Sequence, residues 1–326
     1  MMKPKVYVTR LIPNEVLSII TDRFDCRVWR REDEAVPRET LKAEVAGAHG
    51  LYTMLTEKID ADLLDSAPNL RVVSNMAVGY DNIDVAECTK RGIVVCNTPG
   101  VLTDTTADLA FALLMAAARR VPEAERFVLE SKWSTWSPML LTGVDVFGST
   151  LGIVGLGSIG EAVARRAKGF SMKVLYYNRH PRKDLEAELG VERTTLDELL
   201  ERSDFVSLHD PLTENTRGLI GARELNMMKP TGVLVNTSRG QVVRERDLYV
   251  ALRERRILAA GLDVFEEEPL PQDSPLRELD NVVLLPHIGS ASIATRKKMA
   301  VMAARNLVQV LSGERPDHPV NPEVLG

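Results

Sequence analysis

The sequence predicts an α/β protein made of two doubly wound domains, each with a parallel sheet covered by helices on both faces. Short apolar runs typical of strands alternate with amphipathic stretches typical of helices through most of the chain, as in consecutive β–α–β units. At 326 residues the chain is also longer than the roughly 100–200 residues of one typical domain. We therefore expect two separate cores.

Five apolar runs in the first hundred residues are expected to be the strands of the first sheet. Amphipathic segments at 38–46, 58–67 and 84–91 lie between them and are expected to be helices. Strands that alternate with helices in this way form a parallel sheet that is covered on both faces. The five runs are KVYVT at 5–9, CRVW at 26–29, GLYTML at 50–55, RVVSNM at 71–76 and IVVCN at 93–97.

A segment rich in alanine and leucine, 103–120, follows the first sheet. Threonine and aspartate at its start and two arginines at its end suit the helix dipole, so we expect one long helix. Its middle is apolar on nearly all sides, which is typical of a helix buried between two bodies. The domain boundary is expected here.

A second series of strands and helices begins at Ser149, after a loop that contains two tryptophans. The amphipathic segment 291–312 is expected to be a helix that returns to the first domain. The first domain then comprises residues 1–100 and 291–326, and the second comprises residues 101–290. Six runs are expected to be strands of the second sheet: TLGIVGLG at 150–157, KVLYYN at 173–178, FVSLHDP at 205–211, GVLVNTS at 232–238, AAGLDVF at 259–265 and VVLLPHIGS at 282–290.

Composition and charge exclude several classes of protein. With 44% hydrophobic and 27% charged residues the chain has the composition of a soluble globular protein. Its net charge of -5 provides no general attraction to nucleic acid or to a membrane, and neither is expected as a partner. The sequence has no apolar run of ~18 residues and no signal peptide, so a cytoplasmic location is expected. The three cysteines lack the spacing of a zinc site or a disulfide framework, and no metal is expected.

The segment GLGSIG at 155–160 lies directly between an apolar run and a helical pattern. In a Rossmann domain the first glycine of G-x-G-x-x-G allows a tight turn, the second lets a pyrophosphate approach the backbone, and the third lets helix and strand pack closely. A P-loop motif is absent, which excludes the common NTPase site. We expect a dinucleotide to be bound at the start of the helix, by Gly155, Leu156, Gly157, Ser158, Ile159 and Gly160.

The stretch YYNRHPRK at 176–183 ends the next apolar run, and Asn178 lies 23 positions after Gly155. NAD enzymes usually have an acidic residue ~20 positions after the glycine turn, which binds the ribose 2′-hydroxyl. Basic residues stand there instead, and a guanidinium matches the oxygens of a 2′-phosphate, so NADPH is expected as the preferred cofactor and NADH as the alternative. A solvated basic turn on an NAD-binding protein is the other interpretation. The main phosphate ligand is expected to be Arg179, with Asn178, His180, Arg182 and Lys183 beside it.

Three apolar runs of the second domain end in polar residues that can carry chemistry. Arg239 follows VLVNTS, an acidic cluster at 266–268 follows GLDVF, and His287 follows VVLLP. Ligands of open parallel sheets bind beyond the carboxyl ends of the strands. Each residue has an ordinary structural explanation by itself, but together they predict a site that combines an arginine, a carboxylate and a histidine.

Six motifs occur together and in order: NMAVGYDNID at 75–84, NTPGVLTDTTADLAFALLMAAAR at 97–119, GLGSIG, NTSRG at 236–240, GLDVFEEEP at 261–269 and LPHIGSA at 285–291. In these motifs the chain resembles the D-isomer-specific 2-hydroxyacid dehydrogenases, and most closely the glyoxylate and hydroxypyruvate reductases among them. The resemblance implies a flavodoxin-like substrate domain and a Rossmann cofactor domain. It also implies that NAD(P)H reduces a small 2-oxo acid, glyoxylate or hydroxypyruvate, to glycolate or D-glycerate.

The resemblance implies roles for single residues. Arg239 is expected to bind the substrate carboxylate and polarise its carbonyl, while Glu268 orients His287. His287 is expected to donate a proton to the carbonyl oxygen. The amides around Val78 and Gly79 are expected to bind the other side of the carboxylate. The positions expected at the cofactor are Asp263, at the nicotinamide carboxamide, and Thr237, Ser238, Arg239, His287 and Gly289.

Two further positions keep two interpretations each. Met54 is expected either to line a small apolar side of the substrate pocket or to belong to the core. Trp136, in the loop after the long helix, is expected either to reach the substrate site of a second copy or to anchor a dimer without touching substrate. Both interpretations of Trp136 require a homodimer.

Other classes of protein share parts of this pattern. A nucleotide-sensing corepressor of the same architecture keeps the same three residues, although the chain has no surplus of basic charge for an interaction module. A hydrolase similar to adenosylhomocysteinase holds NAD tightly but needs different motifs in its substrate domain. Within the dehydrogenases, D-lactate and phosphoglycerate are the alternative substrates.

Overall fold

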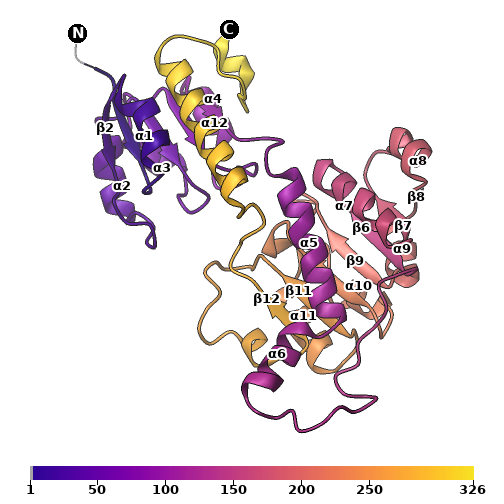
Figure 1. Ribbon diagram of the computed structural model, residues 1–326. Coiled ribbons are helices and arrows are strands. Elements are labelled where there is room, and N and C mark those ends of the chain that lie inside the picture. The colour runs from indigo at the N-terminus through magenta and orange to yellow at the C-terminus, as the bar shows by residue number, and fades with distance from the viewer. Residues whose placement is uncertain (1–2) are drawn as a thin grey trace. The chain divides into compact units, whose positions relative to one another are not determined.

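The computed structural model describes residues 3–326 and divides into two compact units (Figure 1). Residues up to Leu102 together with Ala291–Gly326 form the first unit, and Thr103–Ser290 form the second. Each unit contains one sheet, and all neighbouring strands of both sheets pair in parallel. The prediction of an α/β protein with two doubly wound parallel sheets is confirmed.

The first unit has a five-stranded sheet in the order β2–β1–β3–β4–β5, which is the flavodoxin-like order. The strands lie at the five predicted runs: β1 (Lys5–Val8), β2 (Asp25–Val28), β3 (Gly50–Thr53), β4 (Val72–Asn75) and β5 (Val94–Cys96). The helices are α1 (Asn14–Thr21), α2 (Arg38–Val45), α3 (Ala61–Asp65), α4 (Val85–Lys90) and α12 (Ile293–Leu311).

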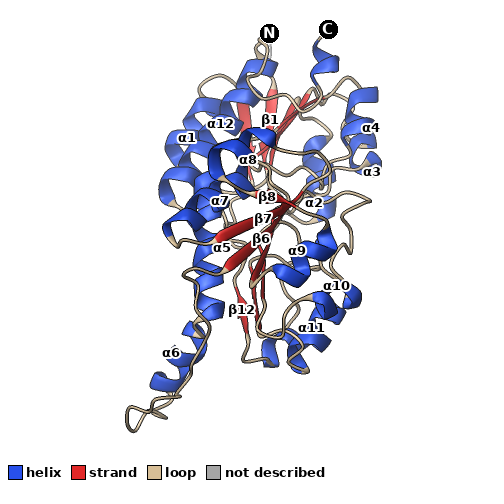
Figure 2. Ribbon diagram, turned by 90° about the vertical axis from the view of Figure 1, so that its right-hand side faces the viewer, coloured by secondary structure: helices blue, strands red, loops and turns tan. Residues whose placement is uncertain are grey.

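Helices cover both faces of this sheet because successive strand residues point to opposite sides. Val6 and Val8 of β1 pack in the cluster that contains residues of α1 and α12. Tyr7, between them, packs in the cluster formed with α2, α3 and α4. Figure 2 shows the two helix layers on opposite sides of β1. The C-terminal helix α12 is therefore part of the core of the unit that holds the N-terminal strands.

The second unit has a seven-stranded sheet in the order β12–β11–β10–β9–β6–β7–β8. Counted from β6, the first strand of the unit, this is the Rossmann order 3-2-1-4-5-6 with one strand added at the far edge. The strands are β6 (Thr150–Val154), β7 (Lys173–Tyr177), β8 (Glu192–Arg193), β9 (Phe205–Leu208), β10 (Val233–Asn236), β11 (Ala259–Leu262) and β12 (Val282–Leu284). The helices are α5 (Thr103–Ala118), α6 (Val121–Leu129), α7 (Ser158–Gly169), α8 (Lys183–Leu189), α9 (Leu196–Arg202), α10 (Ala222–Met227) and α11 (Glu245–Arg253).

Two helix layers cover the seven-stranded sheet as well. The long helix α5 and helix α7 pack with Leu151 and Ile153 on one face, and α9, α10 and α11 pack with Val154 and Leu208 on the other. In Figure 2 these layers lie on opposite sides of β6 and β12. Alternation along β6 thus directs apolar side chains into both cores. Because helices cover both faces of the sheet, only the ends of its strands remain uncovered.

The structure differs from the predicted elements at several places. Helix α1 was not among the predicted segments. The seventh strand, β8, was not predicted, because two residues are too few to show any periodicity. Helix α3 is shorter than the predicted segment 58–67, because Asp60 caps it by accepting a hydrogen bond from the Leu63 N–H. Helix α6 was also not predicted, and none of its residues is buried.

Helix α6 and the first part of the following loop, residues 121–142, form an arm that extends away from the sheet of the second unit (Figures 1 and 2). Large apolar side chains that normally avoid water are exposed along it. They are Val121, Val128, Leu129, Trp133, Trp136, Met139 and Leu140.

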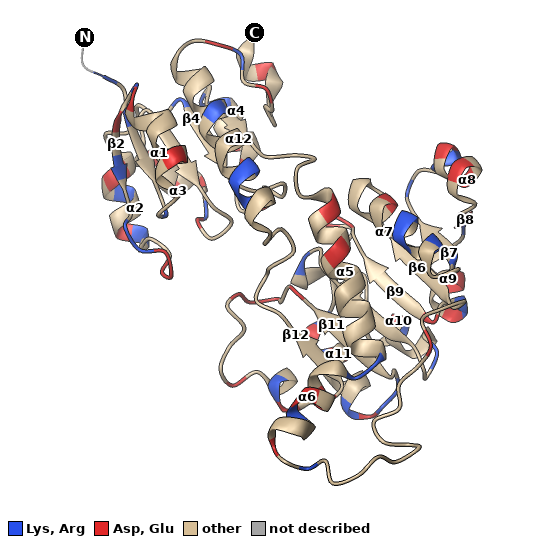
Figure 3. Cartoon of the chain, in the orientation of Figure 1, with Lys and Arg blue, Asp and Glu red and all other residues tan. Residues whose placement is uncertain are grey.

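Acidic and basic residues are interspersed over the surface helices of each unit (Figure 3). Ion pairs join many of them, as between Arg165 and Glu188 or between Arg91 and Asp65. In the described part of the chain, no helix is both long and apolar enough to span a bilayer.

The cysteines lie in the first unit. Cys88 and Cys96 are buried and Cys26 is half-buried. Burial raises the pKa of the Cys88 and Cys96 thiols to about 12. Both thiols therefore stay protonated near neutral pH and act as small apolar side chains.

Candidate active site

The turn between β6 and α7 has the backbone geometry that its three glycines allow. Gly155 has a φ of +92°, which side chains rarely tolerate. A Cβ at Gly160 would lie 2.3 Å from the Gly155 carbonyl oxygen, so this glycine lets the helix pack directly on the turn. At Gly157 a Cβ would meet nothing within 4 Å. The backbone at Gly157 is thus open to a ligand, while the other two glycines shape the turn.

The turn lies at the point where the strand order reverses, between β6 and β9. Asp210, two residues after β9, lies directly behind it, because a Cβ at Gly155 would come within 2.6 Å of Asp210 Oδ1. Burial raises the pKa of Asp210 to about 6 and lowers the pKa of the preceding His209 to about 4. Such a reversal point is where open α/β sheets bind ligands.

Asn178 and Arg182 are tied to the glycine turn. The Leu156 N–H donates a hydrogen bond to Asn178 Oδ1 at 2.7 Å, and Arg182 donates to the Leu156 carbonyl at 3.0 Å. The Arg182 guanidinium also pairs with Glu161 at 3.2 Å and Asp184 at 2.8 Å. Both predicted cofactor ligands therefore use their polar groups to hold the shape of the turn.

Arg179, His180 and Lys183 are exposed at the same strand end. Arg179 Nε donates to His180 Nε2 at 3.2 Å. Within residues 3–326, neither Arg179 nor Lys183 forms an ion pair. A cation without an acidic partner can bind a phosphate without first losing an ion pair. If a cofactor with a 2′-phosphate binds at this strand end, the geometry favours Arg179 and Lys183 over Arg182 as ligands of that phosphate.

The residues at this edge of the sheet fit a dinucleotide. No side chain in the described chain caps the N-terminus of α7, so its first amides remain available to an anion. The Thr237 hydroxyl is buried and has no hydrogen-bond partner among residues 3–326. Ser238 donates its hydroxyl to Asn236 at 2.8 Å, which holds the loop after β10 close to the strand. The open glycine backbone, the uncapped helix and the unpaired hydroxyl are the features expected of a cofactor site.

His287 and Glu268 form a direct pair. His287 Nδ1 lies 2.7 Å from Glu268 Oε2, and the Phe265 N–H donates to Glu268 Oε1 at 3.1 Å. Burial by itself raises the pKa of Glu268, but the hydrogen bond and charge of His287, the Phe265 N–H and the charge of Arg239 outweigh it and leave this pKa lowered. Glu268 is thus ionised and accepts the proton of Nδ1. The other ring nitrogen, Nε2, is then the atom that can exchange a proton with a ligand.

Asp263 holds the loop that carries His287. Its carboxylate accepts the Ile288 N–H at 2.8 Å and the Gly289 N–H at 2.7 Å, and its carbonyl accepts the His287 N–H at 3.0 Å. His287 has a φ of +53°, which is rare for a residue with a side chain and occurs often at functional sites. Burial raises the pKa of Asp263, whereas the two amides act in the opposite direction. Asp263 and Gly289 thus fix the imidazole direction.

Arg239 lies on the same edge of the sheet, three residues after β10. Strands β10, β11 and β12 are neighbours, so their carboxyl ends bring Arg239, Glu268 and His287 together. Arg239 Nη1 donates to the Ser238 carbonyl at 2.8 Å, and its backbone is held by Asn236, whose side chain donates to the Arg239 carbonyl at 2.9 Å. The predicted meeting of an arginine, a carboxylate and a histidine is therefore present in this unit.

In the first unit, Val78 and Gly79 lie in the loop after β4. Within residues 3–326 no hydrogen-bond acceptor is found for their amide N–H groups. Met54, directly after β3, is half-buried and packs against the core cluster of this unit. The loop therefore offers two backbone donors to a ligand, and Met54 contributes at least to the core.

The family of this chain follows from its match to known proteins. The family model described as D-isomer specific 2-hydroxyacid dehydrogenase, NAD binding domain, matches residues 111–289, which contain the glycine turn and all three residues of the sheet edge. The chain belongs to the D-isomer-specific 2-hydroxyacid dehydrogenases. This confirms the resemblance of its motifs to that family.

Over nearly its whole length the chain is similar to members of this dehydrogenase family that are named glyoxylate reductase. It is 58% identical over 326 residues to the glyoxylate reductase of Korarchaeum cryptofilum, with 99% of this chain and 98% of that one covered. It is 51% identical over 328 residues to the glyoxylate reductase of Thermococcus gammatolerans, again with 99% and 98% covered. A solved structure, the NADPH-dependent glyoxylate/hydroxypyruvate reductase of Sinorhizobium meliloti in complex with NADP and malonate, matches with a TM-score of 0.84 and 35% identity, covering 98% of this chain and 97% of that one.

Asparagines at strand ends are the residues of this dehydrogenase that sequence reasoning missed. Asn75 and Asn97 follow the apolar part of β4 and β5, and Asn236 ends β10. Each donates its side-chain amide to a carbonyl of a site loop: Asn75 to Gly79, Asn97 to Val78 and Asn236 to Arg239. The available signal was their position, since an asparagine directly after an apolar strand can hold the following turn.

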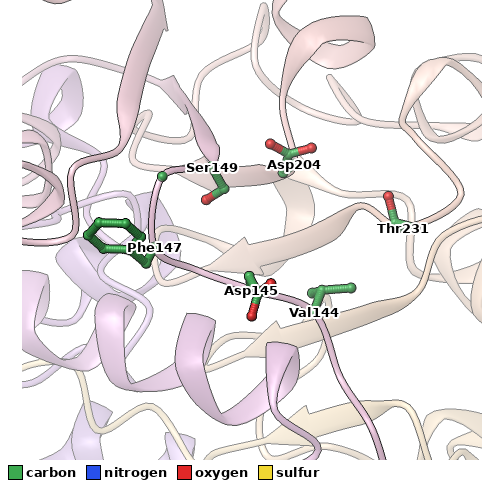
Figure 4. Close-up of a pocket in the computed structure, with 7 residues that line it drawn as sticks. Val144, Asp145, Phe147, Ser149, Asp204 and Thr231 are labelled. Carbon is green, nitrogen blue, oxygen red and sulfur yellow. The ribbon is translucent and has the colours of Figure 1, made fainter.

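A hollow at the opposite edge of the seven-stranded sheet is shown in Figure 4. Ser149, Asp204 and Thr231 line it, and each precedes a strand, so it lies at the amino ends of β6, β9 and β10. Its volume is about 260 Å³. Asp204 accepts the Thr150 N–H at 2.8 Å and pairs with Lys229 at 2.6 Å, so its charge is already compensated. Its lining includes none of the predicted site residues, and this dehydrogenase has its candidate active site at the other edge.

Proposed function

We propose that this protein reduces glyoxylate and hydroxypyruvate to glycolate and D-glycerate, with NADPH as the preferred reductant and NADH as the alternative. The observation that carries the proposal is the pair formed by His287 Nδ1 and Glu268 Oε2 at 2.7 Å, beside Arg239 at the carboxyl edge of a Rossmann sheet. The names of the similar glyoxylate reductases support the choice of substrate.

His287 is the proposed proton donor. Reduction of a ketone or aldehyde leaves negative charge on the carbonyl oxygen, and a protonated imidazole stabilises this charge and then neutralises it. When bound, the nicotinamide cofactor supplies the hydride. The ionised Glu268 accepts the Nδ1 proton, so that Nε2 carries the proton that is transferred. Asp263 supports this role by holding the backbone on both sides of the ring.

Arg239 and the amides of Val78 and Gly79 are the proposed ligands of the substrate carboxylate. A guanidinium binds a carboxylate through two parallel hydrogen bonds, and it also polarises the neighbouring carbonyl. Backbone amides add donors whose position does not depend on a side-chain rotamer. Met54, at the end of β3, is the proposed apolar neighbour of a small substrate.

The cofactor is proposed to bind along the glycine turn with its pyrophosphate at the first amides of α7. The 2′-phosphate is assigned to Arg179, with Lys183 and His180 beside it. Support comes from the exposure of Arg179 and Lys183 and from the absence of any ion pair of theirs among residues 3–326. Thr237, Ser238, Asp263 and Gly289 are the proposed neighbours of the nicotinamide half.

We also propose that the protein is a homodimer in the cytoplasm. The exposed apolar residues of the arm support an interface of two copies, because a row of large apolar side chains in water is unfavourable for a monomer. Trp136 has 76% of its surface exposed. We propose that it either anchors this interface or reaches into the substrate site of the second copy.

A spectrophotometric assay tests the proposed function. The oxidation of NADPH and of NADH is followed with glyoxylate, hydroxypyruvate, pyruvate and phosphohydroxypyruvate as substrates. We expect turnover of the first two, with a lower KM for NADPH than for NADH. Binding of the cofactor without turnover of any 2-oxo acid would contradict the proposal and favour a nucleotide sensor.

A further inference from the structure

The peptide groups of the Val78–Gly79 loop are held by their carbonyl oxygens. The Thr98 N–H donates to the Ala77 carbonyl at 2.8 Å, and the Asn97 side-chain amide donates to the Val78 carbonyl at 2.8 Å. Asn75 donates in the same way to the Gly79 carbonyl at 2.9 Å. The carbonyl oxygens of three consecutive residues are therefore fixed, two of them by the segment 97–98.

This anchoring sets the direction of the two free amides. A trans peptide group is planar, and its C=O and N–H point in opposite directions. The Ala77 carbonyl shares its peptide group with the Val78 N–H, and the Val78 carbonyl shares one with the Gly79 N–H. Because both carbonyls point toward the segment 97–98, both N–H groups point away from it. Two parallel donors of this kind match the oxygens of one carboxylate.

Asn97 is itself held by the C-terminal part of the chain. Its N–H donates to the His318 carbonyl at 3.3 Å, and its carbonyl accepts the Asn306 side-chain amide at 3.1 Å. Asn306 lies on α12 and is fully buried. Hydrogen bonds thus connect α12 through Asn97 to the Val78–Gly79 peptide group. Asn97 and Asn306 are 209 positions apart in the sequence.

We propose that Asn97 is a positioning residue for the substrate carboxylate, and that Asn306 holds it in place. The Asn97 side chain fixes the Val78–Gly79 peptide group so that the Gly79 N–H is aimed at the carboxylate before substrate arrives. The inference rests on the proposed function in one respect, since it assumes that these amides bind the carboxylate. It goes further by assigning the precision of that binding to two asparagines.

The test replaces each asparagine by leucine, which has nearly the same shape but neither a hydrogen-bond donor nor an acceptor. Asn97→Leu should raise the KM for glyoxylate and the Kd for oxamate, an unreactive analogue, by about tenfold, the factor expected when one hydrogen bond is lost. The kcat and the KM for NADPH should stay within about twofold. Asn306→Leu should shift the same two constants in the same direction by a smaller factor, because the Asn97 side chain remains.

A matched control separates positioning from folding. Asn281 of the second unit also donates its side-chain amide to two backbone carbonyls, that of Leu252 in α11 and that of Leu258 before β11, but it holds no predicted substrate ligand. Asn281→Leu should lower the melting temperature and leave the KM for glyoxylate unchanged. If Asn97→Leu does not fold, Asn306→Leu decides: a selective rise of both constants supports the inference and unchanged constants overturn it.

The outcomes also distinguish this inference from the proposed function. Unchanged KM and oxamate Kd in a folded Asn97→Leu variant overturn the positioning role, even if the wild type reduces glyoxylate. If kcat falls and the KM for NADPH rises in parallel with those two constants, the positioning role is overturned as well, because such changes would show a general distortion of the site. If the wild type turns over no 2-oxo acid but binds oxamate, and Asn97→Leu weakens that binding, the proposed function fails and the positioning role stands.

Discussion

Arg179→Ala is the substitution that tests the cofactor preference most directly. Arg179 is exposed at the end of β7, and its only hydrogen bond from the side chain within residues 3–326 goes to His180. Its removal therefore breaks no ion pair of the folded protein, and the melting temperature should change little. We expect the effect to appear only with a cofactor that carries a 2′-phosphate.

The magnitude follows from the chemistry of the pair. A hydrogen bond to a charged group is worth about 1.5–3 kcal/mol, and exposure to solvent reduces such a pair to about 1 kcal/mol. This corresponds to about a fivefold rise in the KM for NADPH. The KM for NADH should remain within about twofold, because NADH has no phosphate at this position. Higher salt should reduce the difference, since the pair is exposed.

Arg182→Ala is the matched control for this measurement. The Arg182 guanidinium donates to the Leu156 carbonyl and pairs with Glu161 and Asp184, so its loss should loosen the glycine turn and raise the KM of both cofactors by the same factor. Steady-state kinetics on glyoxylate give four ratios of variant to wild-type KM, one for each of the two variants with each of the two cofactors. An equal loss of both cofactors in Arg179→Ala, or no loss of either, would refute the assignment of the phosphate site and return the stretch 176–183 to a solvated turn.

Three further substitutions test the rest of the site. Glu268→Gln removes a carboxylate whose pKa is lowered and which is therefore ionised near neutral pH. Because this negative charge stabilises a positively charged proton donor beside it, the pH above which reduction is lost should fall, and an unchanged pH–rate profile would remove Glu268 from this role. Gly160→Ala would bring a Cβ to 2.3 Å from a backbone oxygen and should lower the melting temperature by several degrees in a thermal unfolding experiment. The Cβ added by Gly157→Ala would meet nothing within 4 Å, so the melting temperature should not change, whereas the affinity for both cofactors should fall by about tenfold or more. If cofactor titrations give the same affinities for the variant and the wild type, no phosphate approaches this backbone.

Much of the fold could be predicted from local pattern. The strands of both sheets are short apolar runs bounded by polar turns, and α5 is a long alanine-rich run, so their type follows from residue periodicity alone. The strand β8 could not be found in this way, because Glu192 and Arg193 join the sheet only as an addition to the edge beside β7. The arm helix α6 was also missed, and none of its residues is buried in this chain.

The site was predictable where its residues have distinctive side chains. Arg239, Glu268 and His287 follow apolar strands, and parallel strands place their carboxyl ends on one edge. The asparagines were not predictable as site residues, because a side-chain amide has no specific chemistry until its partner is known. Asn178 illustrates this: its side-chain carbonyl oxygen accepts the Leu156 N–H of the glycine turn, a role that its place after β7 does not predict.

The sequence by itself determined which groups this protein can use. It contains the three-glycine turn, the basic stretch without an acidic residue, and one arginine, one glutamate and one histidine after successive strands. Only the tertiary structure decided which of these groups are available to a ligand. Hydrogen bonds between distant segments engage Arg182 and Asn178 within the protein, leave Arg179 without an acidic partner in the described chain, and fix the Val78 and Gly79 amides through Asn97 and Asn306. The physical reason is that a donor or acceptor already used by a partner within the protein is less available to a ligand, and the fold decides which partner is in reach.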